Sequence, residues 1–382
     1  MNDPAGIMKT QVYEHMQEKD RVGQLSLAHN YDHVENVAKI AGILAPYFGR
    51  KLGVENPNDL RPFAEMAGYG HDAIRYMTQK DSGEASSATF ADTIYHDHLT
   101  SLVDHELYHR LVIDPIETHG ESFGSVSEIY KNDLEAKAVA MAVAAADKLF
   151  EASGPRVLER RSFFVGKERM LNPDDLGAVF KYPEESLLGV LTETMVRLGD
   201  VNHISNYASD PALLAIAEEL HSFQYQFYLG MLFALRTDEQ GSLDYLVQRL
   251  EGSAKTKELA ARLEKAGKRL VAENHFDSTF LDQNGYKHLA NRIRVIPSDL
   301  AESAITLISL YSQTDSLEAA LAAHEANPKG PATFKAWMKA IKAYRNGEYT
   351  NELIRRIEEH TEESDGESSE EEGEEGEVSE AT

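Results

Sequence analysis

Histidine and aspartate residues that could bind a metal ion recur at four separated points in the first 150 residues. His71 and Asp72 are adjacent, His33 lies upstream, and His119 and Asp147 lie downstream. Imidazole nitrogens and carboxylate oxygens are the ligands that divalent first-row transition metals accept. A bound ion of this kind lowers the pKa of a water molecule and polarises a phosphoryl oxygen. The residues therefore predict a metal centre built from segments far apart in the chain.

The order His, His-Asp, Asp resembles that of the HD superfamily of metal-dependent phosphohydrolases. The segment His29-Asn-Tyr-Asp-His33-Val-x-x-Val37 is similar to the opening helix of that family. The segment Leu134-Glu-Ala-Lys137, continuing to Ala146-Asp-Lys-Leu149 and Gly154, is similar to its closing helix. The resemblance covers about residues 25–155. Apolar residues normally precede the His-Asp pair, whereas this chain has Gly68-Tyr69-Gly70.

The resemblance implies a ligand set and a catalytic group. One divalent transition metal (Mn, Fe, Co, Ni or Zn) or Mg is expected, and the residues that would hold it are His33, His71, Asp72 and Asp147. A second ion is compatible with the histidines that follow, which are His96, His98 and His119. His119 could instead contact the substrate phosphate or transfer a proton. Glu84 stands where many members carry an acidic residue, and it could orient the attacking water as a general base.

Basic residues near these positions are candidates for binding a phosphate, because guanidinium groups bind phosphate oxygens in pairs. Arg75 lies one turn after the His-Asp pair and Lys148 follows Asp147 directly. The remaining candidates come from a basic stretch after residue 154, and they are Arg156, Arg160 and Arg161. The alternative for this stretch is an ion-paired surface loop, since Glu159 lies within it.

The composition limits the class of protein. The 382 residues carry a net charge of −26, and residues 361–382 contain only acidic charges. An acidic surface repels nucleic-acid backbones, so broad nucleic-acid binding is not expected. The chain has no cysteine, which excludes disulfides and zinc–thiolate sites. Neither a long apolar run nor a secretory signal is recognisable, so a cytoplasmic protein without membrane contact is expected; a homo-oligomer is compatible with the sequence.

Apolar residues at helical spacing predict an all-α fold. Val34, Val37, Ile40 and Leu44 share one helix face, with Asp32 as the expected N-cap. Other helices are expected at 60–68, about 89–111, 133–150, 184–198 and 211–235, and again between 243 and 360. Breaks are expected at 46–57, 79–88, 115–120, 155–182 and 327–331.

The expected organisation has four parts. Residues 1–24 form a lead-in, and residues 25–240 form an HD-type helical core with a helical extension. Residues 241–360 form additional C-terminal helices, and residues 361–382 form a disordered acidic tail.

Three functions fit these observations. The first is hydrolysis of a small-molecule phosphate ester, such as a nucleotide, by metal-activated water. The second keeps the metal but is oxidative, because a few proteins of similar fold are di-iron oxygenases that resemble inositol oxygenase. The third is a non-catalytic sensing or scaffold module whose C-terminal region binds a partner.

Overall fold

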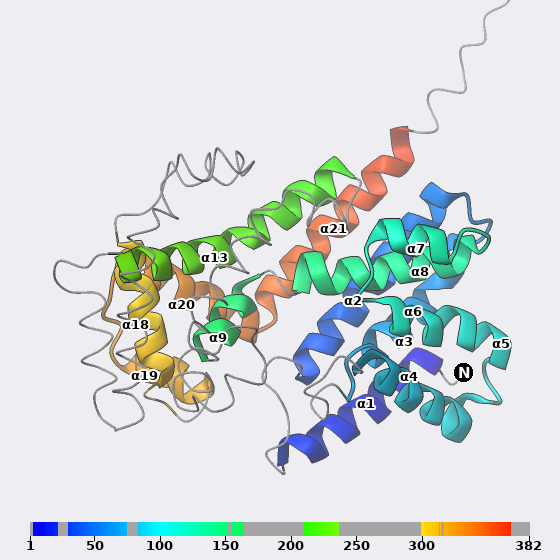
Figure 1. The fold of residues 1–382 in the computed structure, drawn as a ribbon, viewed down its shortest axis with the longest axis horizontal. Helices are drawn as coiled ribbons and strands as arrows, with labels where there is room; N and C mark the ends of the chain where they lie inside the picture. The colour runs from blue at the N-terminus through cyan, green and yellow to red at the C-terminus, as the bar shows by residue number, and fades with distance from the viewer. Residues whose placement is uncertain are drawn as a thin grey trace, which may run out of the picture.

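The computed structural model describes residues 3–21, 30–74, 83–151, 154–163, 210–236, 299–312, 314 and 317–367, and all regular elements in these ranges are helices (Figure 1). The first half comprises α1 (Pro4–Arg21), α2 (Tyr31–Leu52), η2 (Pro57–Leu60), α3 (Arg61–Gly70), α4 (Gly83–Ile94), η4 (Tyr95–Leu99), α5 (His105–Tyr108), η5 (His109–Ile113), α6 (Asp114–Thr118), α7 (Phe123–Ile129), α8 (Leu134–Ala145), η6 (Ala146–Glu151) and α9 (Pro155–Phe163). The second half comprises α13 (Pro211–Arg236), α18 (Leu300–Ser312), α19 (Leu317–Ala326), α20 (Ala332–Arg345) and α21 (Glu348–Glu367). The prediction of an all-α fold is confirmed.

Helix α2 is the central helix of the N-terminal core, where it packs against α3 and α8. Its apolar face, predicted from the spacing, is fully buried, including Val34, Ile40 and Leu44. The N-cap is Asn30 rather than Asp32, because the Asn30 side chain accepts a hydrogen bond from the backbone N–H of His33. This cap sets the first turn of α2 and therefore the position of His33.

The predicted break at 46–57 is wrong in its first part, because α2 continues through Pro46 to Leu52. A proline inside a helix removes one backbone hydrogen bond and costs about 3 kcal/mol. Here the neighbours Tyr47 and Phe48 are buried in the core. Burial of these two rings offsets the lost bond, since each large aromatic side chain contributes about 1.5–3 kcal/mol.

Gly68 allows α3 to approach α2 at close range. A Cβ atom at Gly68 would lie 2.5 Å from the Cα atom of Ala38, which is closer than real contacts allow. Gly68 lies three residues before His71, where the resemblance led us to expect apolar residues. This glycine is required for the close packing of α3 on α2. The contact brings the C-terminal end of α3 alongside α2, which carries His33.

Three further segments differ from the predicted breaks. Helix α4 begins at Gly83, although 79–88 was expected to be a turn, and residues 75–82 lie outside the described ranges. Residues 114–118 form the short helix α6, and residues 155–163 form α9 instead of a basic loop. In α9 a proline occupies the first helical position, where its missing N–H costs nothing, whereas α6 continues directly from η5 and has Pro115 at its second position.

The first helix belongs to the core and is more than a lead-in. One face of α1 buries Met8, Val12 and Met16, and this helix packs against α3. The low overall apolarity of residues 1–24 obscured this narrow apolar stripe, which runs at a spacing of four residues.

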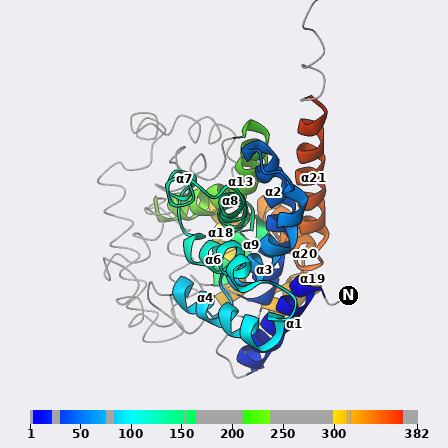
Figure 2. The same ribbon diagram turned by 90° about the vertical axis from the view of Figure 1, so that its right-hand side faces the viewer.

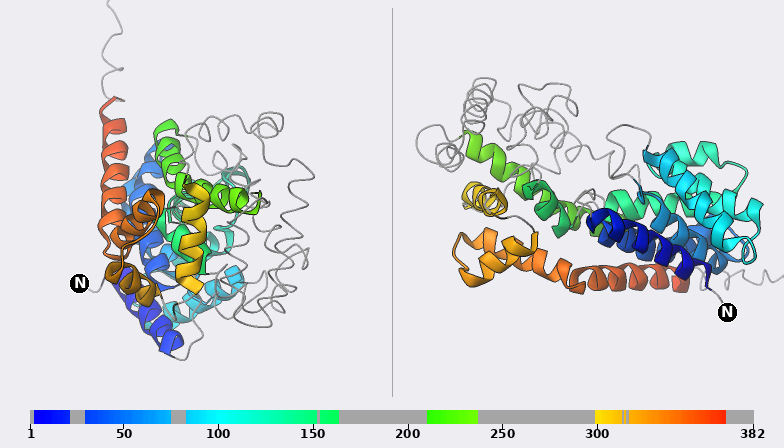
Figure 3. Two further views of the ribbon diagram at one scale, coloured as in Figure 1. Left: turned by 90° about the vertical axis from the view of Figure 1, so that its left-hand side faces the viewer. Right: turned by 90° about the horizontal axis from the view of Figure 1, so that it is seen from below.

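The C-terminal helices pack onto the first half of the chain. In Figure 1, α18, α19 and α20 gather at one end of the molecule, with α13 and α21 running between them and the α1–α8 core. Figure 2 shows α21 alongside α2, and the right-hand view in Figure 3, seen from below, shows α13 and α21 as the two long connections.

Asp210 joins α2, α13 and α21 through four polar contacts. It caps α13 by accepting from the backbone of Leu213, and it pairs with Lys51 at 2.6 Å and with His360 at 2.9 Å. The hydroxyl of Tyr47 also donates to it. Three helices that are distant in the sequence are therefore fixed relative to one another.

The predictions for the C-terminal half of the chain agree with the structure in part. The predicted helix 211–235 agrees with α13, and the predicted break at 327–331 separates α19 from α20. Helix α21 extends to Glu367, so residues 361–367 are helical where a disordered tail was expected. The helix expected at 184–198, the boundary at 240/241 and residues 368–382 lie outside the described residues. Within the part described, no helix is both long and apolar enough to cross a lipid bilayer.

Candidate metal centre

Four of the predicted ligands meet at the interface of α2, α3 and η6. The Nε2 atom of His33 lies 3.2 Å from Nε2 of His71, 3.5 Å from Oδ2 of Asp72 and 3.4 Å from Oδ1 of Asp147. His71 Nε2 lies 3.6 Å from Asp72 Oδ2 and 3.9 Å from Asp147 Oδ1. The four side chains come from three separate parts of the chain and point their ligand atoms at one spot.

All four side chains are buried, with at most 4% of any residue exposed. Burying two carboxylates with no compensating charge is strongly unfavourable. The group therefore requires a positive charge among its members or between them.

The π-helical turn η6 aims Asp147 at this group. A π-helical turn widens the helix by one residue, and such turns are frequent at functional sites. Lys148, the next residue, bonds Asp147 Oδ2 at 2.8 Å. Burial opposes ionisation of Asp147, but the charge of Lys148 beside it outweighs burial and holds the pKa of Asp147 well below its usual value. Lys148, predicted as a phosphate contact, thus lies at the centre beside a ligand.

His71 is held as a neutral imidazole. Burial lowers its pKa to about 3, because the charged form would lose its solvation, and the nearby Asp72 and Asp147 only partly oppose this. Its Nδ1–H donates to the backbone oxygen of Gly68 at 2.7 Å. The lone pair of Nε2 is therefore directed at the centre, as a metal ligand requires.

His119 joins the same centre from the end of α6. Its Nδ1–H donates to the backbone oxygen of Ile116 at 2.6 Å, and its Nε2 lies 3.8 Å from Asp72 Oδ1. That Nε2 atom is buried, and no residue in the described ranges gives it a hydrogen bond. A buried acceptor without a hydrogen-bond partner is costly, so this atom is suited to binding a ligand, an ion or a water molecule.

The donor set fits a divalent metal ion. Three imidazole nitrogens and two carboxylates converge, and within two sets of three the ligand atoms lie within 4.8 Å of one another: His33, His71 and Asp72; and His71, His119 and Asp147. The lone pairs of His71 and His119 are oriented by backbone oxygens, and no hydrogen bond from the described residues occupies His119 Nε2. Such N/O sets suit Mn, Fe, Co, Ni or Zn.

Glu84 lies against Gly120, the residue that follows His119. A Cβ atom added at Gly120 would come within 2.9 Å of Oε1 of Glu84, so the carboxylate rests against the residue after His119. Glu84 is in the first turn of α4 and is partly exposed.

Arg156 is buried behind His33. Its Nη1 donates to Nδ1 of His33 at 2.8 Å and lies 3.5 Å from Oε1 of Glu151. The guanidinium group was predicted to bind phosphate, but it is hydrogen-bonded to Nδ1 of the predicted ligand His33. Arg75 lies outside the described residues, and the side chains of Arg160 and Arg161 on α9 also lie outside them.

Sequence reasoning missed three residues around His33: Glu151, Asn36 and Tyr344. Two of them had a signal in the sequence, since Glu151 follows Asp147 by four residues and Asn36 follows His33 by three, which is helical spacing. Tyr344 had none, because it lies 193 residues from its partner Glu151.

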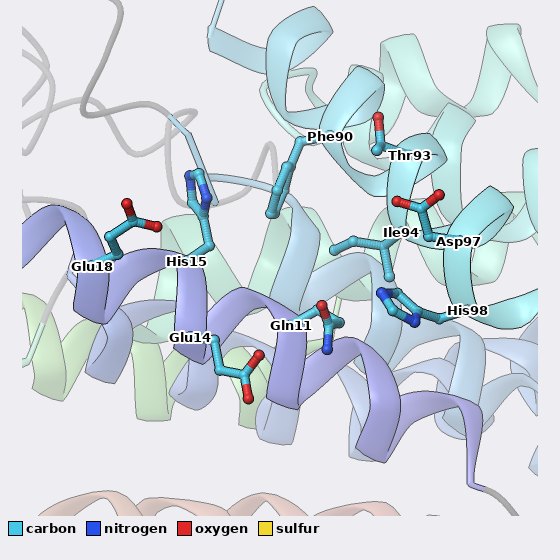
Figure 4. A pocket seen from close by; sticks show the side chains of 9 residues that line it. All are labelled: Gln11, Glu14, His15, Glu18, Phe90, Thr93, Ile94, Asp97 and His98. Carbon is cyan, nitrogen blue, oxygen red and sulfur yellow. The ribbon is translucent and has the colours of Figure 1, made fainter.

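His96 and His98 lie elsewhere. Both are exposed on η4, and His96 groups with Asp92 and His105 instead of the buried histidines. His98 lines a pocket of about 250 Å³ between α1 and the α4–η4 segment, together with His15 and Phe90 (Figure 4). Three histidines were candidates for a second metal ion, namely His96, His98 and His119. Of these, only His119 lies at the buried centre.

No protein-family model, curated protein sequence or solved structure matches this chain. The geometry of the centre and the chemistry of its residues therefore carry the functional argument.

Proposed function

We propose that this chain is a metal-dependent phosphohydrolase with an HD-type centre. The observation that supports the proposal most directly is the buried meeting of His33, His71, Asp72 and Asp147, with the unpartnered Nε2 of His119 beside them. Burial of this set is costly without a cation, and the donor atoms match a divalent ion. The substrate class is a phosphate ester, most simply a nucleotide.

The residues divide the chemistry between binding and proton transfer. A bound divalent ion supplies a water molecule of lowered pKa and offsets charge on a phosphoryl oxygen. Glu84 accepts a proton and orients the attacking water from beside Gly120. His119 presents Nε2 to the same space; when Nε2 carries a proton, it would donate that proton to a phosphoryl oxygen or to the leaving group, while Glu84 keeps the proton taken from water. Lys148 adds positive charge beside Asp147.

The oxidative alternative would need extra histidine ligands for a second iron. His96 and His98, the residues available for that role in the sequence, are exposed on η4, and only His119 lies near the centre. The arrangement therefore favours hydrolysis over the di-iron interpretation.

The test combines metal analysis of the purified protein with a screen of phosphate esters, nucleotides first. We expect close to one tightly held divalent ion and hydrolysis of at least one ester, both lost on prolonged chelation. Bound iron with consumption of O₂ would support the oxygenase instead. Bound metal with no turnover of any ester would support a sensing or scaffold module.

A further inference from the structure

Behind His33, on the side away from the centre, three helices contribute a buried polar group. Glu151 comes from η6, Arg156 from α9 and Tyr344 from α20, and each is less than one-tenth exposed. The Tyr344 hydroxyl donates to Oε1 of Glu151 at 2.7 Å. The same Oε1 atom lies 3.8 Å from Nδ1 of His33. A continuous path of polar contacts thus runs from the C-terminal helices to a ligand of the centre.

This group is expensive to bury. Taking a carboxylate and a guanidinium out of water costs several kcal/mol per ion, and their mutual attraction often does no more than offset it. An apolar cluster would hold these helices together equally well. The presence of charged residues on the Nδ1 side of His33 therefore indicates that they help to orient its imidazole.

The tautomer of His33 explains the role. To bind a metal through Nε2, a histidine must carry its proton on Nδ1 and needs an acceptor there. His71 and His119 use backbone oxygens for this purpose. His33 instead faces Arg156, which can only donate, and Glu151, which can accept.

We propose that Glu151 and Tyr344 are positioning residues for the metal centre: Tyr344 on α20 holds the Glu151 carboxylate 3.8 Å from Nδ1 of His33. Nδ1 accepts from Arg156 in this structure, and Glu151 is the acceptor beside it when metal binding at Nε2 places the proton on Nδ1. Glu151 thereby competes with Arg156 for Nδ1 and favours the tautomer that binds the metal. The inference rests on the proposed metal centre and adds that α20, from the C-terminal part of the chain, is needed to complete it.

Several contacts hold α20 in register for this task. Burial and the nearby Glu151 carboxylate raise the pKa of Tyr344 well above its usual value, so its hydroxyl stays a donor. Asn36 donates to the same hydroxyl at 3.4 Å. The next residue, Arg345, bonds both oxygens of Glu159 on α9 and lies 3.6 Å from Asp32, which neighbours His33.

The test is a double-mutant cycle of Tyr344→Phe and Glu151→Gln in the full chain, read out by Mn²⁺ affinity. Mn²⁺ is followed by its electron paramagnetic resonance signal, because it binds generic nitrogen and oxygen sites most weakly in its series and so reports little on surface groups. Loss of a residue that orients a ligand typically lowers metal affinity by about 10–100-fold. We expect a loss in this range for each single variant, and little further loss in the double variant, since both act through His33.

The matched control is Tyr108→Phe. Tyr108 is another buried tyrosine, and its hydroxyl donates to the backbone oxygen of Ala91 within the α4–α5 region. This variant should lower the melting temperature by about as much as Tyr344→Phe while leaving Mn²⁺ affinity unchanged. Melting curves followed by circular dichroism show that all variants remain folded.

The outcomes separate this inference from the proposed function. Wild-type Mn²⁺ affinity in folded Tyr344→Phe, or fully additive losses in the double variant, would overturn the positioning role while leaving the metal centre intact. A wild-type protein that binds no metal would overturn both. Coupled losses of affinity in a protein that hydrolyses no ester would support the positioning role and remove only the hydrolase.

Discussion

Two groups of histidine and aspartate residues have nearly the same composition and opposite surroundings. The buried centre contains His33, His71, Asp72 and Asp147, whereas the surface group contains Asp92, His96 and His105. In each, a set of three ligand atoms lies within 4.8 Å. At the surface group, His96 and Asp92 are one helical turn apart, with side chains 59% and 38% exposed and 3.7 Å between Nε2 and Oδ2.

The two groups differ in preorganisation and not in the proximity of their ligand atoms. Exposed side chains are solvated and mobile, so holding them around an ion costs side-chain entropy and their charges are screened. In the buried centre, backbone oxygens orient two imidazoles, and packing has already ordered every side chain. Preorganisation of this kind is what converts a set of ligand types into tight binding.

The largest expected effect distinguishes Asp72 of the buried centre from Asp92 of the surface group. Asp72→Asn removes one negative charge and weakens one ligand at the buried centre, so metal should be lost and hydrolysis abolished, with only partial recovery at high metal concentration. Asp92→Asn makes the same chemical change at the surface group and should leave turnover at the wild-type level. Steady-state rates and metal content of the two variants measure this. Full activity in Asp72→Asn would remove the metal from the mechanism.

The second prediction concerns proton transfer at the buried centre. Glu84→Gln should retain the metal and lower the rate by about 10²–10⁴-fold, the range typical of a lost general base. Glu106→Gln on α5, beside the surface group, is the matched change and should have no effect. Rates are compared at saturating substrate together with metal content. If Glu84→Gln loses the ion as well, Glu84 acts on the metal and not on the water.

The third prediction uses acid to distinguish the two groups. His71 has a folded pKa of about 3 against 6.5 unfolded, so between these pH values the unfolded chain binds the extra proton. The free energy of unfolding of the metal-free protein should therefore be highest above about pH 6.5. It should fall by several kcal/mol in total as the pH drops toward 3. The depressed pKa of Asp147 adds a loss of the same sign at still lower pH.

Urea unfolding at a series of pH values measures this effect. His105→Gln changes an exposed histidine and should leave the pH dependence as in the wild type, whereas His71→Gln should flatten it. A pH dependence that is equally steep in His71→Gln would assign the acid sensitivity to other groups.

The smallest expected effect is at the surface group itself. His105→Ala should remove only weak binding of added Zn²⁺, leaving one tightly held ion per chain after dialysis, as in the wild type. Metal content before and after dialysis tests this, with His98→Ala as the exposed-histidine control. Loss of the tightly held ion in His105→Ala would reverse the ranking of the two groups.

Local patterns in the sequence were enough to predict the helical class and the histidine and aspartate residues that meet in the fold. Helical spacing of Val34, Ile40 and Leu44 marked the buried face of α2, and the order of His33, His71, Asp72 and Asp147 marked residues that the structure brings together. Both signals can be read from the sequence alone, because a helix repeats over a few residues and the chemical type of a ligand does not depend on the fold.

Tertiary packing decided the remaining features. Pro46 lies inside α2 because Tyr47 and Phe48 are buried, and Gly68 is required by a contact with Ala38 that only the folded chain creates. Sequence spacing placed His96 and His119 in one set, but folding leaves His96 exposed and brings His119 to the centre. Tyr344 reaches Glu151 from 193 residues away. Contacts between distant segments depend on how whole helices pack, and no local pattern records that.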